Sequence, residues 1–320
     1  MELHTQALDF ALDLPFLRAW PEVQELLQRG APPNAAVWKM PLLACEAVGG
    51  TPDQVIPVSA ALACLQLNII LIDDLLDADP RGEYHRIGAP ATANIAAALQ
   101  AAGLEAIMQG GVNDSVKLAA LSRLNQMMLT TAFGQHFDVQ NPADEEAYWR
   151  VVRTKSSPFF GAALQLGALF AGASAETAAG LGQIGQLYGA LIQIHDDLDD
   201  AMAVPANADW LQGRSSLPIL FARLVDHPDR PRFLELCRSA SDSENLAEAQ
   251  AILIRCGAIS YCVDQLTRRY DQAEELLRDI PLAHRAGLAD LLEAQIRPVR
   301  EFFRAAGVMP PNAAEESRET

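Results

Sequence analysis

The chain has 320 residues, of which 50% are hydrophobic and 20% are charged, so it is long enough to bury a large core. Its formal net charge of -17 excludes nucleic acid as an expected partner, because surfaces that bind nucleic acid are basic. The N-terminus lacks a basic stretch followed by an apolar one, and the most apolar runs, 58–72 and 159–175, are interrupted by amide side chains. With five cysteines and no CxxC pair, these features predict a cytoplasmic protein without a transmembrane segment and with reduced cysteines.

Helical periodicity extends through nearly the whole chain, and no segment alternates polar and apolar residues with the period of a strand. Alanine and leucine dominate the composition, which also favours helix. Glycine and proline separate the predicted helices, which are, in chain order, 15–29, 34–48, 57–79, 92–109, 114–138, 144–155, 158–172, 175–203, 216–226, 230–239, 244–256, 258–279 and 283–305. No stretch has the composition of a linker. We therefore predict an all-α fold, with one domain at residues 1–309 and a disordered polar tail at residues 310–320.

Two short acidic segments stand out, DDLLD at residues 73–77 and DDLDD at residues 196–200. Each has carboxylates at its first, second and fifth positions, and in a helix the first and the fifth project from the same face. Like charges at this spacing repel, and carboxylates beside an apolar core are costly to desolvate. A solvated helix end would explain one such cluster, but two of matching form point to a shared role. The pattern predicts the two walls of a magnesium site, because Mg2+ takes carboxylate oxygens and leaves positions open for phosphate.

Both clusters end long apolar runs, at residues 67–72 and 188–194. An apolar wall that leads into an acidic group is typical of a deep pocket with a charged mouth, where metal ions hold the polar head of an apolar ligand. A calcium-binding loop is the alternative, but the alternating oxygen ligands around a central glycine are absent.

From about residue 15 to residue 300 the sequence resembles the all-trans isoprenyl diphosphate synthase (polyprenyl synthetase) family. The strongest matches are DDLLD at 73–77 and QIHDDLDD at 193–200. Three weaker ones follow the order of the family's motifs: GQHFD at 134–138 resembles its GQxxD element, Lys155-Ser156 its Lys-Thr pair, and GRSSLP at 213–218 its GKxTLP element. Each short match could arise by chance, but five in this order favour the fold of the family.

This resemblance implies a single-domain isoprenoid synthase helical bundle around a central cavity, and a homodimer. It also implies that three Mg2+ ions bridge the two clusters to the diphosphate of an allylic prenyl substrate. The residues that the resemblance assigns to the site are Asp73 and Asp77 for two ions, Asp196 for the third, Asp74, Asp197 and Asp200 in support, Lys155 and Arg214 for the diphosphate, Gln193 near the cation, and Gln135 within the GQxxD element.

The implied reaction is a prenyl transfer. Metal ions and basic side chains neutralise the departing pyrophosphate, and a dry apolar pocket shields the allylic cation from water. The alkene of isopentenyl diphosphate then attacks the cation, and loss of a proton gives a longer trans-prenyl diphosphate. Asn68 and Ile69 stand where the family closes the product pocket, although a structural hydrogen bond is an equally good interpretation of Asn68. His195 is expected to pack away from Asp196 rather than act as a base.

One part of the pattern departs from the family. Members that elongate with isopentenyl diphosphate carry a GGKR-like element and a further arginine before Pro-Leu-Leu. Here Val37 and Trp38 replace its basic pair, Met40 replaces the arginine, and only Lys39 remains nearby. The arginines expected after the first cluster are reduced to Arg81 and, further on, Arg86. Each lost charged hydrogen bond removes about 1.5–3 kcal/mol, so the second diphosphate should bind more weakly.

Three functions therefore remain open from the sequence. The first is elongation with isopentenyl diphosphate, in which Lys39, Arg81 and Arg86 rebuild the second anion site. The second is a one-substrate class I terpene synthase or cyclase, or prenyl transfer to a different acceptor, on the same fold. The third is a non-catalytic partner subunit, which the intact acidic clusters argue against because such a subunit gains nothing from costly carboxylates.

Overall fold

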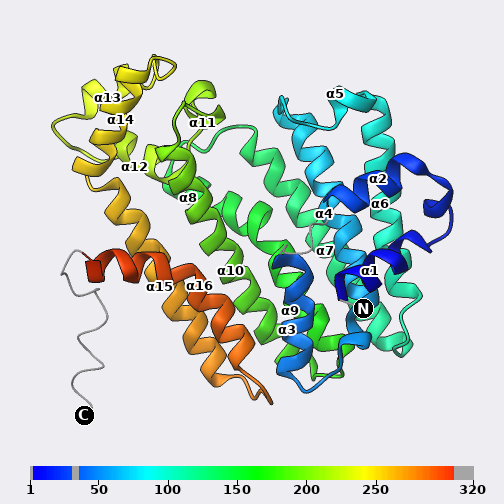
Figure 1. Cartoon of the computed structure of the whole chain (residues 1–320). Coiled ribbons are helices and arrows are strands. Elements are labelled where there is room, and N and C mark those ends of the chain that lie inside the picture. The colour runs from blue at the N-terminus through cyan, green and yellow to red at the C-terminus, as the bar shows by residue number, and fades with distance from the viewer. Residues whose placement is uncertain (1–2, 31–35, 306–320) are drawn as a thin grey trace, which may run out of the picture.

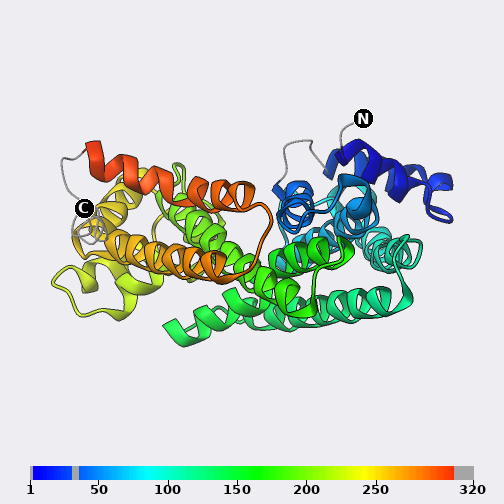
Figure 2. The ribbon, with the colours of Figure 1, turned by 90° about the horizontal axis from the view of Figure 1, so that it is seen from below.

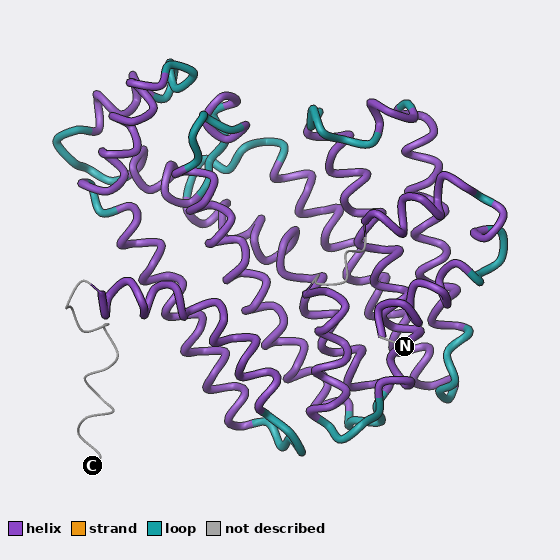
Figure 3. The backbone as a smooth tube through the Cα atoms, viewed as in Figure 1, coloured by secondary structure: helices purple, strands orange, loops and turns teal. Residues whose placement is uncertain are grey.

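The computed structural model describes residues 3–30 and 36–305, and within these ranges every regular element is helical (Figure 3). The first half of the chain forms α1 (Leu3–Leu12), the 3-10 turn η1 (Leu17–Ala19), α2 (Pro21–Gly30), α3 (Ala36–Ala47), the 3-10 turn η2 (Pro52–Val55), α4 (Ile56–Asp77), α5 (Tyr84–Ile87), α6 (Ala89–Met108) and α7 (Asp114–Asp138). The second half forms α8 (Glu145–Val151), the π-helical turn η3 (Val152–Ser156), α9 (Ser157–Phe170), α10 (Ala175–Met202), α11 (Ala208–Gln212), α12 (Leu217–Leu224), α13 (Arg230–Leu236), α14 (Ser243–Arg255), α15 (Ala258–Asp279) and α16 (Ala286–Ala305). The all-α prediction is confirmed.

The long helices follow the predicted ranges, but the N-terminal part does not. The prediction of one helix at 15–29 is wrong: α1 lies before this range, and η1 and α2 divide it. Phe16 adopts a left-handed conformation with φ of 70°, which no helix continues through, and Pro21 occupies the first position of α2, where its missing N–H costs nothing. The short helices α5 and α11 are too brief to show a helical period in sequence.

Helix α4 is apolar almost throughout because it is buried on most sides. It packs against α6 and α9, and its residues from Pro57 to Cys64 are all buried. By length and composition Pro52–Asp77 could cross a membrane, but 72% of its most apolar window lies inside the protein. The helices α14 and α15 pass the same test only as a pair bent by 55°. The apolar run before the first acidic cluster is therefore a core helix.

Helices α9 and α10 have the most extensive contact among the described helices, and glycine makes their close approach possible. A Cβ atom at Gly185 would lie 2.3 Å from the carbonyl oxygen of Phe160, and one at Gly189 would lie 2.7 Å from the Cα of Ser157. Figure 2 shows α10 between α9 and α15 in the middle of the molecule. This packing holds the end of η3 against the middle of α10, which positions the site described below.

The main hydrophobic core extends from α1 to α16, and a second cluster of buried residues lies under α11 to α14, around Trp210 and Phe233. The single domain at residues 1–309 remains a prediction. The tail at residues 310–320 lies outside the described residues.

Candidate active site

The two acidic clusters lie at the C-terminal ends of α4 and α10, which reach the same end of the bundle (Figure 1). A cleft of about 220 Å3 separates them, and its walls include Asp73 and Asp77 from α4 and Asp197 and Asp200 from α10. Helices α4 and α10 are far apart in sequence, but both end at this cleft. The structure thus brings the two clusters together across one shared space.

Lys155 lies between the clusters on the π-helical turn η3. Its Nζ is 3.1 Å from Asp73 Oδ1 and 2.5 Å from Asp138 Oδ2. Burial alone would lower the pKa of Lys155, but Asp138 and Asp73 together raise it, so the ammonium group stays charged. The wide turn is held by α7, because a Cβ atom at Gly134 would lie 2.4 Å from the backbone nitrogen of Lys155. A π-helical turn often marks a functional position in a helix.

Arg214 closes the cleft from the loop before α12. Its guanidinium lies 3.0 Å from Asp77 Oδ2, and Gln135 on α7 donates more weakly to Asp77 Oδ1 at 3.4 Å. The Oε1 atom of Gln135 is buried and has no hydrogen-bond donor among the described residues. Lys155 and Arg214 therefore each hold one aspartate of the first cluster.

Asp197 holds several elements together. Its carboxylate accepts hydrogen bonds from Tyr148 Oη at 2.7 Å, the Leu217 backbone N–H at 2.7 Å and Gln193 Nε2 at 2.8 Å. Ser156 Oγ donates to the other end of the Gln193 amide at 2.6 Å. Burial raises the pKa of Asp197 to about 7, although these three donors oppose that rise. Asp197 therefore ties α8, α10 and α12 together and fixes the orientation of Gln193.

The other predicted acids differ in their position. Asp200 lines the cleft, whereas Asp196, one turn earlier on the same face of α10, does not; both side chains are exposed. Partial burial raises the pKa of Asp196, and the neighbouring Asp200 adds to this effect. Asp74 lines none of the cavities found in the described part of the chain; a Cβ atom at Gly82 would lie 3.0 Å from its side chain. Asp74 thus lies beneath the loop that follows α4.

The sequence interpretation missed two acids of the cleft. Asp138 binds Lys155, and Asp209 on α11 lines the cleft beside Arg214. Burial raises the pKa of Asp209 to about 6, and Asp200 is the next cause. Asp138 closes the GQHFD segment and could have been assigned from it, whereas no sequence pattern marks the short helix that carries Asp209.

The cleft is strongly acidic. Six aspartates and only two basic side chains line it, and burial raises the pKa of Asp73 despite the contact with Lys155. In the part of the chain that the structure describes, no three His, Cys, Asp or Glu side chains are close enough to chelate one ion. An excess of carboxylates that do not converge on one point fits divalent cations whose remaining ligands come from an anionic substrate or water.

An apolar cavity of about 570 Å3 continues from the cleft and shares Asp73 and Lys155 with it. Asn68 and Ile69 line this cavity, as do residues of α6 and α7. The Nδ2 atom of Asn68 donates to the Ala96 carbonyl at 2.6 Å, so the structural hydrogen bond expected of Asn68 exists alongside its place in the cavity wall. The arrangement joins a charged mouth to a long apolar pocket.

The basic residues expected around a second anion are dispersed. Lys39 is exposed and lines none of the cavities in the described chain. Arg81 is bound by Asp79 at 2.8 Å, and Arg86 pairs with Glu83 and Glu25. Of Lys39, Arg81 and Arg86, only Arg81 lines a cavity, which it shares with Asp79 and Arg214.

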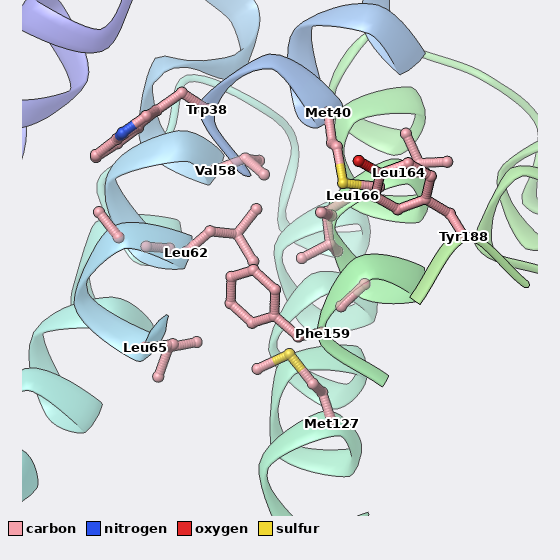
Figure 4. Packing of buried hydrophobic residues seen from close by; sticks show 14 of the residues in the cluster. Trp38, Met40, Val58, Leu62, Leu65, Met127, Phe159, Leu164, Leu166 and Tyr188 are labelled. Atoms are coloured by element: carbon pink, nitrogen blue, oxygen red, sulfur yellow. The ribbon is translucent and has the colours of Figure 1, made fainter. Parts of the chain in front are cut away.

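The residues that replace the expected basic ones are part of the core. Trp38 and Met40 are both buried; Figure 4 shows Trp38 beside Val58 of α4 and Met40 beside Leu166 of α9. The side chain of Val37 lies outside the described residues. At positions 38 and 40, apolar side chains thus fill the space that charged ones would need.

His195 faces away from the cleft, as expected, because its Nε2 lies 2.8 Å from the Gln295 carbonyl oxygen on α16.

Comparison with known proteins agrees with this fold. The family model "Polyprenyl synthetase" matches residues 39–253. A short chain isoprenyl diphosphate synthase of Methanothermobacter thermautotrophicus is 29% identical over 236 residues, which cover 69% of this chain and 72% of that protein. The octaprenyl diphosphate synthase of Escherichia coli is 24% identical, over 75% of this chain and 78% of that protein.

Solved structures share the architecture. The geranylgeranyl pyrophosphate synthetase of Pyrococcus horikoshii aligns over 92% of this chain and 94% of its own, with a TM-score of 0.81 and 20% identity. A geranylgeranyl pyrophosphate synthase of Corynebacterium glutamicum, solved with calcium and isoprenyl diphosphate, has a TM-score of 0.79 and 21% identity over 92% of this chain and 94% of its own. The molecule has the isoprenoid synthase fold, and the chain belongs to the polyprenyl synthetase family. It is a prenyltransferase of that family.

Proposed function

We propose that the protein ionises an allylic prenyl diphosphate with the help of Mg2+ and condenses the cation with isopentenyl diphosphate, giving a longer trans-prenyl diphosphate. The observation that carries this proposal is the single cleft walled by both acidic clusters and continuous with an apolar cavity. The diphosphate would occupy the cleft, and its hydrocarbon chain would extend along Ile69 and the walls of α6 and α7.

We assign about three divalent ions to the cleft and to the acidic residues next to it, where the ions would bridge protein and substrate. Asp73 and Asp77 would hold two of them and Asp196 the third, with Asp74, Asp197 and Asp200 in support. When bound, the ions would act as Lewis acids that stabilise charge on the departing pyrophosphate. The excess of acidic groups in the cleft supports this assignment, because their mutual repulsion disfavours the fully ionised site without a cation.

The chain's own residues supply the remaining steps. Lys155 and Arg214 would move from their aspartate partners to the diphosphate oxygens, where their fixed positive charge favours cleavage of the allylic C–O bond. Gln193, whose amide is held by Ser156 and Asp197, would direct its dipole toward the cation. The apolar cavity beyond Asp73 would exclude water until a second alkene attacks.

The acceptor side of the site supports a second candidate function. Trp38 and Met40 are buried in the core, and Arg81 and Arg86 are already paired with carboxylates. A degenerate site for isopentenyl diphosphate would leave the cation free to cyclise, or to react with an acceptor that carries no diphosphate. We rank this one-substrate reaction, or transfer to a different acceptor, second. A non-catalytic partner subunit is the least favoured function.

The outer face of α7 supports a homodimer. Leu118, Leu129 and Phe133 recur at helical spacing on this face and are 68%, 72% and 55% exposed. Leu129 also lines the prenyl cavity, so a second copy packed against α7 would complete the cavity wall. We place this dimer in the cytoplasm.

Product analysis tests these functions. The purified chain would be incubated with Mg2+ and geranyl, farnesyl or geranylgeranyl diphosphate, with and without isopentenyl diphosphate. Longer diphosphates that need isopentenyl diphosphate support elongation, whereas hydrocarbons or alcohols formed without it support the second candidate. Asp73→Asn should abolish either reaction, while Asp199→Asn, a neighbour of the second cluster outside the cleft wall, should change it little. Full activity of Asp73→Asn would refute the site.

A further inference from the structure

A second cavity, separate from the acidic cleft, also borders η3, and Val152 lines both. It has a volume of about 490 Å3, and most of its walls come from η3, α10 and α15; α10 packs against both of the others. Three arginines line it, Arg153, Arg268 and Arg269, together with four glutamines, and no acidic side chain of the described chain does. In a protein with a formal net charge of -17, a cavity whose ionisable groups are all cationic is the opposite of the average surface.

Of the three arginines, only Arg268 forms an ion pair with a carboxylate of the described chain. Arg268 pairs with Asp264 at 2.8 Å. Arg269 stacks 3.6 Å above the Trp149 ring and donates to the carbonyl and side-chain oxygens of Gln265 at 2.9 and 2.8 Å, so its hydrogen bonds go to neutral groups. Arg153 makes no hydrogen bond or ion pair with any residue of 3–30 or 36–305. Two full positive charges therefore remain.

These two charges act on each other. Burial is the main cause that lowers the pKa of Arg269, and the positive charge of Arg153 acts in the same direction. Glu145 acts in the opposite direction on the pKa of Arg269, but its carboxylate accepts a hydrogen bond from Trp149 Nε1 at 3.0 Å rather than from an arginine. An anion between Arg153 and Arg269 would relieve this repulsion. The guanidinium groups and the glutamine amides that line the cavity carry many N–H donors, which an oxyanion with several acceptor oxygens requires.

We propose that this cavity is a second diphosphate-binding site, separate from the acidic cleft, in which Arg153, Arg268 and Arg269 bind the anion without a metal ion. The choice of a diphosphate rests on the proposed function, since the proposed reaction uses prenyl diphosphates and releases pyrophosphate. The apolar side chains of Trp149, Val152 and Leu187 in the same cavity leave room for part of a hydrocarbon chain.

The position of the cavity connects it to the catalytic residues. Arg153 and Lys155 lie two residues apart on the same π-helical turn, and Val152 lines both the cleft and the second cavity. On α10, Ala190 of the second cavity lies one turn before Gln193 of the cleft. An anion that orders Arg153 would therefore also restrain the turn that presents Lys155 to Asp73.

Calorimetric titration of the full chain with inorganic pyrophosphate in EDTA tests the proposal, because without cations the acidic cleft repels the anion. We expect one pyrophosphate per chain. Arg153→Gln, which breaks no contact in the folded protein, should weaken its binding about tenfold or more through the loss of charged hydrogen bonds. Arg278→Gln is the matched control, since it removes the same charge from α15 outside the cavity.

A second titration, with non-hydrolysable farnesyl thiodiphosphate, tells whether the second cavity binds free pyrophosphate or the diphosphate of a prenyl chain. Equal affinities for the two ligands would mean that the diphosphate group alone accounts for binding. Tighter binding of the prenylated ligand would mean that the apolar wall of the cavity also contributes. No binding in EDTA, or an equal loss in Arg153→Gln and Arg278→Gln, would overturn the proposal. Turnover with Mg2+, measured separately, tests the proposed function: binding in EDTA without any turnover would leave the second site standing and refute the reaction.

Discussion

Lys155 and Arg214 show how single residues set up the cleft. Each is held by an aspartate of the first cluster, at 3.1 Å and 3.0 Å, so two positive charges lie in the cleft beside its carboxylates. Burial strengthens these contacts, since the charges are less screened than on the surface. The same pairing keeps the acidic cleft from being wholly negative.

Replacing Lys155 with Gln should lower kcat/KM for the allylic diphosphate by at least about 100-fold, because two charge-assisted contacts of about 1.5–3 kcal/mol each are lost. Lys39→Gln is the matched control, since Lys39 is exposed and outside the cavities. Steady-state kinetics with both substrates varied would measure the effects. A raised KM for isopentenyl diphosphate in Lys39→Gln would mean that Lys39 belongs to the acceptor site after all.

The cysteines give a prediction of pH dependence. Burial raises the pKa of Cys64 to about 12, and Cys45 and Cys262 are also buried, whereas Cys237 and Cys256 are partly exposed. The thiolate is the reactive form, so raising the pH from 7.5 to 9.5 should speed alkylation of Cys237 and Cys256 and leave Cys64 unlabelled. Peptide mass spectrometry after iodoacetamide treatment would measure this. Rapid native labelling of Cys64 would contradict the buried position of α4.

At the scale of elements, the sequence predicts what local periodicity can encode. The helices that end in the acidic clusters, α4 and α10, follow their predicted ranges closely, since long apolar runs and flanking glycines mark them. The π-helical turn η3 falls mostly within the last turn of the helix predicted at 144–155, because its extra residue per turn leaves no mark in the period. The role of Asp209 was missed for a related reason, since α11 is one turn long and depends on tertiary contacts.

The contact between α7 and η3 can be tested with one methyl group. Gly134→Ala would place a Cβ atom 2.4 Å from the Lys155 nitrogen, so the turn must move. We expect a loss of about 1–3 kcal/mol in the free energy of unfolding and a larger loss of activity, because Lys155 and Gln135 lie at this contact. A Cβ atom at Gly111 would meet no atom within 4 Å, so Gly111→Ala should change neither stability nor activity. Denaturant unfolding and kcat/KM would be measured for both; an active, stable Gly134→Ala would contradict the close packing.

At the scale of the whole molecule, the proposed metal site requires that cation and anion bind to the acidic cleft together. No three carboxylates converge on one ion in the described chain, so Mg2+ alone has few protein ligands. We expect Mg2+ with pyrophosphate to raise Tm by more than the sum of the two separate shifts, because each completes the site for the other. Asp73→Asn should remove this excess, whereas Arg153→Gln should keep it. Additive shifts in the unmodified protein would contradict a bridged metal site.

The apolar outer face of α7 also matters at the scale of the whole molecule. A sequence cannot reveal which exposed positions a second copy of the chain covers. Leu129 is 72% exposed and lines the prenyl cavity, so in a homodimer it would be buried and would help to close the pocket. Leu129→Glu should convert the dimer to a monomer in size-exclusion chromatography with light scattering, since burying a carboxylate in an apolar interface is costly. Prenyl transfer should fall in parallel as water enters the cavity. Ile254→Glu, which adds the same charge at a residue 59% exposed on α14, should leave both the mass and the activity unchanged. A monomeric unmodified chain with full activity would contradict the proposed homodimer, and the cavity would then be walled by α4, α6, α7 and η3 of one chain alone.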